Sequence, residues 1–525
     1  MAEREERELP GWAVGGLLAL VLAFAATVFL SGIRRDLPLI QEIDEPLFVG
    51  IGLRVAGTGN LNPGWFGHPG STLIYPLAAA DRLWDSAGRD SSPAGARSTL
   101  YERAERAPET FFLIGRLVSV AYAILAVPLV FSVARLAFDE LTALGATWLA
   151  VLPVVALDHA QMARTDAPGV FFALLGLWRC LVLVERPGYR NQALAGLAIG
   201  LAIATRYFLA ALVPLLVVVD LLGARERRGG ARIAREAPRA ALGLVCVGLG
   251  FALSTPYFLL DHGAVATSLG HEARARHPGS DGLDFVGNLL WYARFAIPSS
   301  LTWPVTAVAA AGALLAAVRR ARGPLLLLLF AAVFLVGIAL SPLHEQRWII
   351  QLLPVFAMFA AWPIVELARS LGRRAGAPSV ARAAAALLAI GLISVAPCAQ
   401  LAGYLRARQL PSTRLVARQW VIEHLPRDCA IEQELYGVPL AGTGLRAVER
   451  PTLAAGSPLA ERARAGGRYL VASSWIYQRY LADPARYPAE VAFYTSLFSS
   501  AHLLVEFAPG ATLRGPVVRI YDLLG

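Results

Sequence analysis

Residues 11–33 read GWAVGGLLALVLAFAATVFLSGI, and this unbroken apolar stretch decides how the rest of the chain is interpreted. A membrane-spanning helix needs about 20 predominantly apolar residues, so the stretch is long enough to cross a bilayer. The acidic pair Asp44-Glu45, followed by Pro46, comes shortly after its end. Carboxylates are natural general bases, and this pair lies where the chain leaves the membrane. The sequence therefore places candidate chemistry at a membrane surface.

The composition is that of an integral membrane protein. Of the 525 residues, 56% are hydrophobic and only 16% are charged, which is more apolar material than a soluble core can bury. The net charge of +10 comes with basic residues gathered in short stretches between apolar runs. That pattern is typical of cytoplasmic loops and argues against a nucleic-acid partner. The charged opening MAEREERELP is interpreted as a cytoplasmic tail ahead of a retained anchor.

Further apolar runs follow the first one. They cover residues 111–138, 141–157, 167–184, 193–204, 208–222, 241–260, 301–318, 324–340, 348–367 and 381–399. Span length therefore predicts an α-helical polytopic membrane protein with about eleven transmembrane helices. With a cytoplasmic N-terminus, the arginine-rich segments between these runs all fall on the inside.

The same parity puts three loops outside, at residues 34–110, 158–166 and 262–300, together with the tail beyond residue 400. A first loop of this length is uncommon unless it is functional or disordered. Trp65 and Trp84 within it are typical of helices that lie in the membrane interface. We therefore expect interfacial helices and an ordered surface in this loop.

The tail changes character. Helical spacing at residues 416–425 is followed by short strand-like runs at 430–434, 469–473, 503–507 and 517–521. This order predicts a small soluble α/β domain at residues 401–525, beside a transmembrane domain at residues 1–400.

The first outer loop carries two candidates for chemistry. One is the pair Asp44-Glu45, and the other is His68 in the segment Gly67-His68-Pro69-Gly70. An acid just before a proline also often caps a helix, so the pair alone leaves a structural role open.

Asp166 ends the second outer loop, shortly after Arg164 and just before Pro168. Its carboxylate either caps the following helix or acts in a site, because ionisable groups at a membrane boundary are usually functional.

Two arginines lie at boundaries of apolar runs. Arg206, followed by Tyr207, sits in a short junction where an unpaired guanidinium is costly unless it reaches water or an anion. A phosphate would bind such a group through two hydrogen bonds. Arg347 enters the membrane on the same side, and an ion pair with Glu345 is the alternative role for it.

Other chemical signals are weak. The four cysteines have no CxxC spacing, and we interpret them as packing residues. The histidines of the loop 262–300 are too irregularly spaced for a fixed zinc pattern. No P-loop, GxSxG or dinucleotide fingerprint occurs in its required strand-turn-helix setting.

The order of these parts resembles the polytopic, lipid-phosphate-dependent glycosyltransferases of the protein mannosyltransferase and aminoarabinose transferase superfamily, which have the GT-C fold. Asp44-Glu45 matches the acidic motif of their first loop. His68-Pro69 is similar to their HPP motif, with Gly70 in place of the second proline. The segment 161–166 is similar to the one that carries their second acid. The segment 196–207 is similar to their GLA…TK segment, with arginine in place of the usual lysine.

The resemblance implies a membrane glycosyltransferase that moves a sugar from a polyprenyl-phosphate donor to an acceptor hydroxyl, with inversion. Asp44 would be the catalytic base, and Glu45 or Asp166 would orient the acceptor or hold a divalent cation. Arg206 and Arg347 would bind the donor phosphate. The residues that would contact substrate are His68, Arg164 and Tyr207. The acceptor would be a lipid, a glycan or a protein. The location would be a bacterial plasma membrane, with the active site and the C-terminal domain on the extracytoplasmic side.

Two other classes of protein remain open from the residues. A secondary transporter or lipid flippase would place its ionisable groups near the bilayer midplane on broken helices, whereas here most lie at the outer ends of spans. A non-enzymatic receptor or scaffold that displays the C-terminal domain would leave Asp44, Asp166 and Arg206 without a role.

Overall fold

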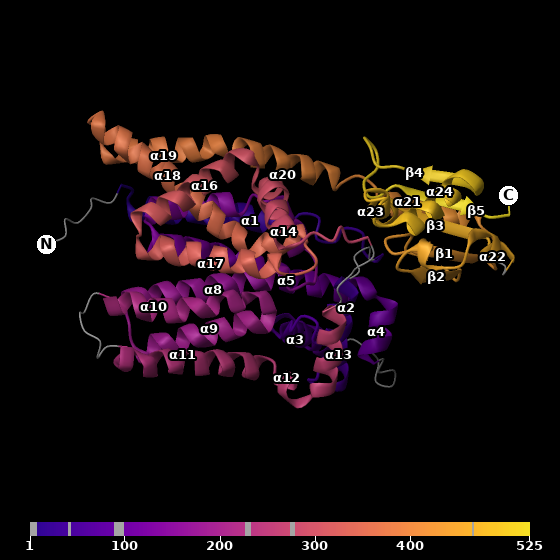
Figure 1. The fold of residues 1–525 in the computed structure, drawn as a ribbon, viewed down its shortest axis with the longest axis horizontal. Helices are drawn as coiled ribbons and strands as arrows, with labels where there is room; N and C mark the ends of the chain where they lie inside the picture. Colours follow the sequence, from indigo (N-terminus) through magenta and orange to yellow (C-terminus); the bar gives the residue numbers. More distant parts are fainter. Residues whose placement is uncertain are drawn as a thin grey trace. The chain divides into compact units, whose positions relative to one another are not determined.

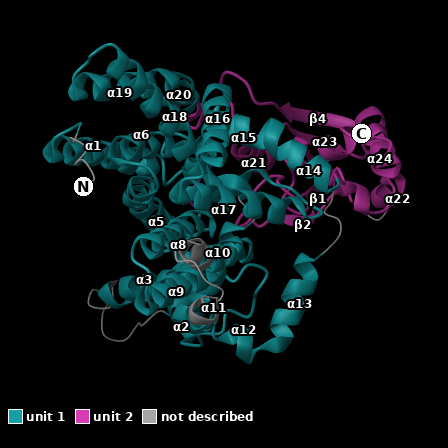
Figure 2. Cartoon of the chain, turned by 60° about the vertical axis from the view of Figure 1, so that its left-hand side comes forward, with its two compact units in different colours: residues 1–35, 44–273, 284–401 teal, residues 36–43, 274–283, 402–525 magenta. Residues whose placement is uncertain are grey.

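The computed structural model describes residues 8–39, 44–88, 99–225, 233–273, 279–464 and 467–524. The chain forms two compact units, which Figure 2 distinguishes by colour. The first comprises Met1–Arg35, Asp44–Ala273 and Asp284–Leu401. The second comprises Asp36–Ile43, Arg274–Leu283 and Ala402–Gly525.

The first unit is helical. Its elements are α1 (Gly11–Leu30), α2 (Glu45–Thr58), α3 (Ser71–Gly88), α4 (Leu100–Arg106), α5 (Pro108–Ala137), α6 (Glu140–Ala150), α7 (Val154–Ala160), α8 (Asp166–Glu185), α9 (Tyr189–Thr205), η2 (Tyr207–Leu212), α10 (Val213–Arg225), α11 (Ile233–Ser254), α12 (Tyr257–Leu260), α13 (His262–Glu272), α14 (Phe285–Trp291), η4 (Tyr292–Ala296), α15 (Ile297–Leu301), α16 (Trp303–Arg319), α17 (Arg322–Ala339), η5 (Gln346–Leu352), α18 (Leu353–Arg374), α19 (Ser379–Ile393) and α20 (Val395–Ala407).

The apolar helices lie in the segments where the sequence predicts crossings, but fewer than eleven are long enough to be counted as spans. Within the described part of the chain, six helices are long and apolar enough to span a membrane, and there are up to nine spans if each of three bent helix pairs counts as one. The two other expected crossings fall in α9, which has 17 residues, and in the shorter apolar helix Tyr207–Val219. The polytopic helical fold is therefore confirmed, and the chain is an integral membrane protein. The first loop contains α2, α3 and α4.

Close backbone contact holds α9 against α11, and the two helices run side by side in Figure 1. A Cβ atom at Gly196 would lie 2.3 Å from the carbonyl oxygen of Gly243, and one at Gly200 would lie 2.4 Å from that of Val247. Small residues spaced by four are what membrane helices use to approach this closely. α9 in turn packs on α8, and α8 packs on α5. This stack fixes where Arg206, at the end of α9, meets α8.

A buried acid in α3 gives the fold a pH-dependent stability. Asp81 has no solvent exposure, and both of its oxygens are without a hydrogen-bond partner among the described residues. Burial raises the pKa of Asp81 to about 7. The native state thus keeps a proton that the unfolded chain, with an aspartate pKa near its usual ~4, has already lost. Stability therefore falls as the pH rises from about 4 to about 7, and it stays low above that range.

Asp81→Asn is accordingly expected to raise the thermal unfolding midpoint by several degrees at pH 8, since the amide has no charge to desolvate. At pH 4 the effect should be small, because the wild-type carboxyl is then protonated. Unfolding of detergent-purified protein, followed over a pH series, measures both values. An equal shift at the two pH values would show that ionisation of Asp81 is irrelevant.

The second unit contains a five-stranded sheet with the order β2-β1-β3-β5-β4. The strands are β1 (Ala430–Glu434), β2 (Arg446–Arg450), β3 (Tyr469–Ser473), β4 (His502–Phe507) and β5 (Val518–Asp522). The helices are η6 (Leu453–Ala455), α21 (Thr413–His424), α22 (Leu459–Arg464), α23 (Ser474–Leu481) and α24 (Pro488–Ser500). β1 pairs in parallel with β2 and β3, while β5 is antiparallel to β3 and β4.

The predicted α/β tail is confirmed, with one strand more than expected. The edge strand β2 has the sequence RAVER and is mostly exposed, so it lacks the apolar alternation that marks a strand. Two short segments from other parts of the chain join this unit. Asp36 pairs with Arg514 at 2.5 Å, and the carbonyl of Asp281 accepts a hydrogen bond from Arg486 at 3.0 Å.

Candidate active site

Asp44 is held by two arginines that are distant from it in sequence. It occupies the position before the first residue of α2, but its side chain makes no capping hydrogen bond. Its Oδ2 instead contacts Arg164 Nη2 at 2.7 Å and Arg347 Nη1 at 2.8 Å. The side chain is 36% exposed, so solvent still reaches the carboxylate. The arrangement therefore gives Asp44 an electrostatic role in place of the capping role that its position allows.

Arg347 reaches Asp44 from the N-terminal end of η5. The neighbouring Gln346 stabilises this turn, because its side-chain amide donates hydrogen bonds to Ser299 Oγ at 2.9 Å and to Ser300 Oγ at 3.2 Å. Arg347 Nε is buried and has no hydrogen-bond partner among the described residues. The guanidinium thus has donor capacity left for an anion.

Asp166 and Arg206 form a buried ion pair. Arg206 Nη1 donates to Asp166 Oδ1, and the two side chains are 5% and 2% exposed. Arg164 Nε lies 3.5 Å from the other oxygen of Asp166. A Cβ atom at position 169 would lie 3.3 Å from Arg206 Cδ and 2.8 Å from Gln351 Nε2, so Gly169 leaves room for the arginine beside α8. The anion that Arg206 needs is therefore supplied, in this structure, by Asp166.

Glu45 points away from solvent into a second ion pair. It has no exposed surface, and Arg116 Nε and Nη2 each donate to it at 2.8 Å. The amide of Ala163, next to Arg164, donates to the same carboxylate at 3.2 Å. Arg116 Nη1 also donates to the carbonyls of Ile33 and Arg35, at 2.9 and 2.8 Å. The Arg116–Glu45 pair thus connects the segment after α1, the start of α2 and the turn that carries Arg164.

Sequence reasoning missed Arg116. It lies inside the apolar run 111–138, and a lone ionisable residue within a membrane helix is a signal in its own right. One arginine barely changes the overall hydropathy of this run, so hydropathy alone does not reveal it.

His68 belongs to the same neighbourhood. Burial, with a smaller contribution from the charge of Arg206, lowers the pKa of His68 to about 4, so the imidazole is neutral at pH 7. Its ring lies edge-on to Trp65, with centroids 5.3 Å apart. Tyr207 supports the loop, because its hydroxyl donates to the carbonyl of Phe66 at 2.8 Å.

The structure explains why glycine, and not a second proline, follows His68-Pro69. Gly70 has φ +63°, whereas proline is fixed near −65°, so a second proline cannot adopt this turn. A Cβ atom there would also lie 2.9 Å from the ring of Phe48. The departure from the HPP pattern follows from the local backbone.

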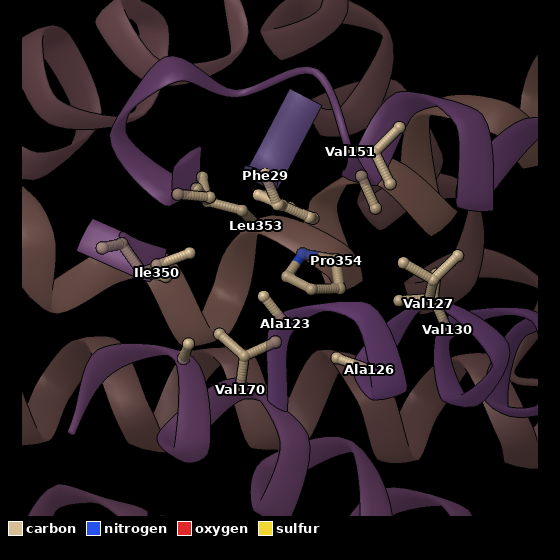
Figure 3. A pocket seen from close by; sticks show the side chains of 14 residues that line it. Phe29, Ala123, Ala126, Val127, Val130, Val151, Val170, Ile350, Leu353 and Pro354 are labelled. Carbon is tan, nitrogen blue, oxygen red and sulfur yellow. The ribbon is translucent and has the colours of Figure 1, made fainter. Parts of the chain in front are cut away.

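An apolar pocket adjoins these charged residues along the chain (Figure 3). Its lining residues are Phe29, Ala123, Ala126, Val127, Val130, Ala150, Val151, Ala156, Ala160, Ala167, Val170, Ile350, Leu353 and Pro354. Every one of them is apolar. Ala167 directly follows Asp166, and Ile350 lies in the same 3-10 turn as Arg347. The apolar pocket is therefore lined in part by sequence neighbours of Asp166 and Arg347.

No group of three or more histidine, cysteine, aspartate or glutamate side chains within the described part of the chain is arranged to hold a metal ion. The carboxylates near the site are instead engaged by arginines, as described above. Glu45 pairs with Arg116, and Asp166 pairs with Arg206.

The fold has counterparts among known proteins. The family model of dolichyl-phosphate-mannose-protein mannosyltransferase matches residues 112–251. The oligosaccharyltransferase of Archaeoglobus fulgidus, tethered with an acceptor peptide, is similar with a TM-score of 0.54 and 13% identity, over 96% of this chain and 74% of that one. No curated protein matches the chain in sequence.

ArnT from Cupriavidus metallidurans, bound to undecaprenyl phosphate, is similar with a TM-score of 0.51 and 14% identity, over 97% of this chain and 98% of that one. The oligosaccharyltransferase AglB of A. fulgidus, in complex with an inhibitory peptide and a dolichol-phosphate, has a TM-score of 0.50 and 15% identity. It is matched over 96% of this chain and 74% of its own. The chain thus has the GT-C fold, as its sequence predicted.

Proposed function

We propose that this protein is a glycosyltransferase that moves a sugar from a polyprenyl-phosphate donor to an acceptor hydroxyl. The observation that carries the proposal is Asp44, a partly exposed carboxylate held by Arg164 and Arg347. Cations for a phosphate, an apolar pocket for a lipid and a base for a hydroxyl are the parts such a reaction needs. The similar ArnT structure contains undecaprenyl phosphate, which supports the same class of donor here.

The reaction follows from these parts. Asp44 takes the proton of the acceptor hydroxyl, and the acceptor oxygen bonds to the anomeric carbon of the sugar. The bond from that carbon to the phosphate oxygen breaks, and its electron pair stays with the phosphate. Arg347 and Arg206 stabilise the charge that develops there. Attack from the face opposite the leaving phosphate inverts the anomeric centre.

The remaining residues position these groups. Glu45, through Arg116, fixes the start of α2, and with it the position of Asp44. Arg164 links Asp44 to Asp166. The neutral ring of His68 is suited to hydrogen bonding with sugar hydroxyls rather than to binding the phosphate.

Washed membranes that contain the protein, incubated with a panel of radiolabelled polyprenyl-phosphate sugars, test the proposal. Label should move from one donor into a membrane-associated product, and Asp44→Asn membranes should not transfer it. If wild-type and Asp44→Asn membranes behave alike with every donor, the transferase proposal is rejected. Movement of an intact labelled lipid between leaflets would instead support a flippase.

Arg206 offers a test of donor binding. Arg206→Ala is expected to weaken binding of a non-hydrolysable polyprenyl-phosphate analogue strongly, because a cation near the phosphate is lost. Arg206→Lys should retain substantial affinity, since it keeps the charge that pairs with Asp166. Binding to purified variants with unchanged unfolding midpoints is the measurement. Equal affinity in wild type and Arg206→Ala would make the arginine purely structural.

The proposed site faces the outside of a bacterial plasma membrane, and residues 401–525 form a soluble domain on that side. Reporter fusions at Ser91 and Gly525, both outside the described residues, should each give an external signal. The reason is the inside position of the arginine-rich loops. A fusion within the loop between α17 and α16 serves as the internal control. A cytoplasmic signal at either outer position would reverse the assigned side.

A further inference from the structure

Asp44, the base in the proposed function, is already in ion pairs with two arginines. A single oxygen of Asp44, Oδ2, receives Arg164 at 2.7 Å and Arg347 at 2.8 Å. If the donor phosphate uses Arg347, it competes with Asp44 for the same guanidinium. This competition links the binding of the donor to the state of the base.

The two arginines on Asp44 are unequal. Arg164 is 7% exposed and also faces Asp166 at 3.5 Å, so its position is set from two sides. Arg347 is 20% exposed, and its buried Nε is unused by any described residue. Gln346 holds the backbone of η5 in place through its hydrogen bond to Ser299. The guanidinium of Arg347 can therefore change its partner without a shift of the backbone. Arg347 is therefore the partner that can be exchanged.

The balance of charge around Asp44 also favours an exchange at Arg347. Arg164, Arg206 and Arg347 face the two carboxylates Asp44 and Asp166. His68 is neutral at pH 7. Among these three arginines and two carboxylates there is one positive charge in excess, which matches the single negative charge of a phosphodiester. The cations outnumber the carboxylates, so a phosphate can take one guanidinium without leaving a carboxylate unpaired.

We propose that the donor phosphate displaces Asp44 from Arg347, so that donor binding frees the base and must precede productive binding of the acceptor. The inference rests on the proposed function and adds an order of substrate binding to it. After the exchange, Arg164 alone holds Asp44 Oδ2, and the place that Arg347 vacates on this oxygen is available to the acceptor hydroxyl. Before the exchange, both guanidinium groups occupy Oδ2.

A double-mutant cycle with undecaprenyl phosphate as the probe tests the exchange without any acceptor. Asp44→Asn removes the competitor, so this variant should bind undecaprenyl phosphate about tenfold more tightly than wild type, the worth of one charge-assisted hydrogen bond. In the Arg347→Gln background the same substitution should change affinity less than twofold. Arg347→Lys, which retains one cation, is the second variant if the glutamine variant unfolds. Isothermal titration of detergent-purified proteins supplies the affinities.

Asp158→Asn is the matched control, because Asp158 is a partly exposed acid paired with Arg35 outside the cluster. It should leave the affinity unchanged. Equal or weaker binding by Asp44→Asn would overturn the exchange. A tenfold gain that persists in the Arg347→Gln background would overturn it too, because simple charge repulsion would then explain the gain. Failure of wild type itself to bind undecaprenyl phosphate would reject the donor class of the proposed function, and the exchange with it.

Discussion

Asp44→Asn is expected to lower turnover by about 100-fold or more, the usual worth of a positioned general base. The amide keeps the shape of the side chain and can still accept a hydrogen bond from Arg164. It cannot take the proton of an acceptor hydroxyl at neutral pH. Initial rates with the best donor from the membrane panel, normalised to the amount of folded protein, give the ratio.

The control for this prediction is Asp158→Asn, which neutralises a nearby acid outside the cluster and should keep activity within a fewfold of wild type. Should Asp44→Asn also stay within a fewfold, Asp44 is not the base. Asp166 would then be the next candidate, although its side chain is 2% exposed and is occupied by Arg206.

Arg116→Ala is expected to destabilise the fold by about 3–5 kcal/mol, because it leaves the buried carboxylate of Glu45 without its cation. The Glu45 side chain is 0% exposed and the Arg116 side chain is 8% exposed, so water cannot replace the lost contacts. The hydrogen bonds to the carbonyls of Ile33 and Arg35 are lost as well. Unfolding of purified protein in detergent measures the loss.

Arg135→Ala is the matched control, since Arg135 lies on the same helix but is exposed. It should change the free energy of unfolding by no more than about 0.5 kcal/mol. The double variant Glu45→Gln with Arg116→Gln should be less destabilised than Arg116→Ala alone, because no buried charge is left unpaired. A loss no larger than that of Arg135→Ala would show that the pair does not hold the fold together.

Local sequence signals predicted some parts of this structure and missed others. The strand β3 was predicted with its observed bounds, because the short apolar run YLVAS at residues 469–473 is a local signal. β2 was missed because an exposed, charged edge strand carries no such signal. The need of Arg206 for an anion was argued from its place between apolar runs, but its partner Asp166 was not identified as that anion.

The sequence by itself determined the membrane class, the approximate positions of the apolar helices and the α/β character of the tail. Each of these follows from hydropathy and spacing within one segment. Only the tertiary structure decided that Asp44 meets Arg347, 303 residues away, and that Glu45 is buried against Arg116. Such pairs depend on which helices pack together. Packing is set by close contacts such as those of Gly196 and Gly200 with α11, and not by any property of the segment that carries the charge.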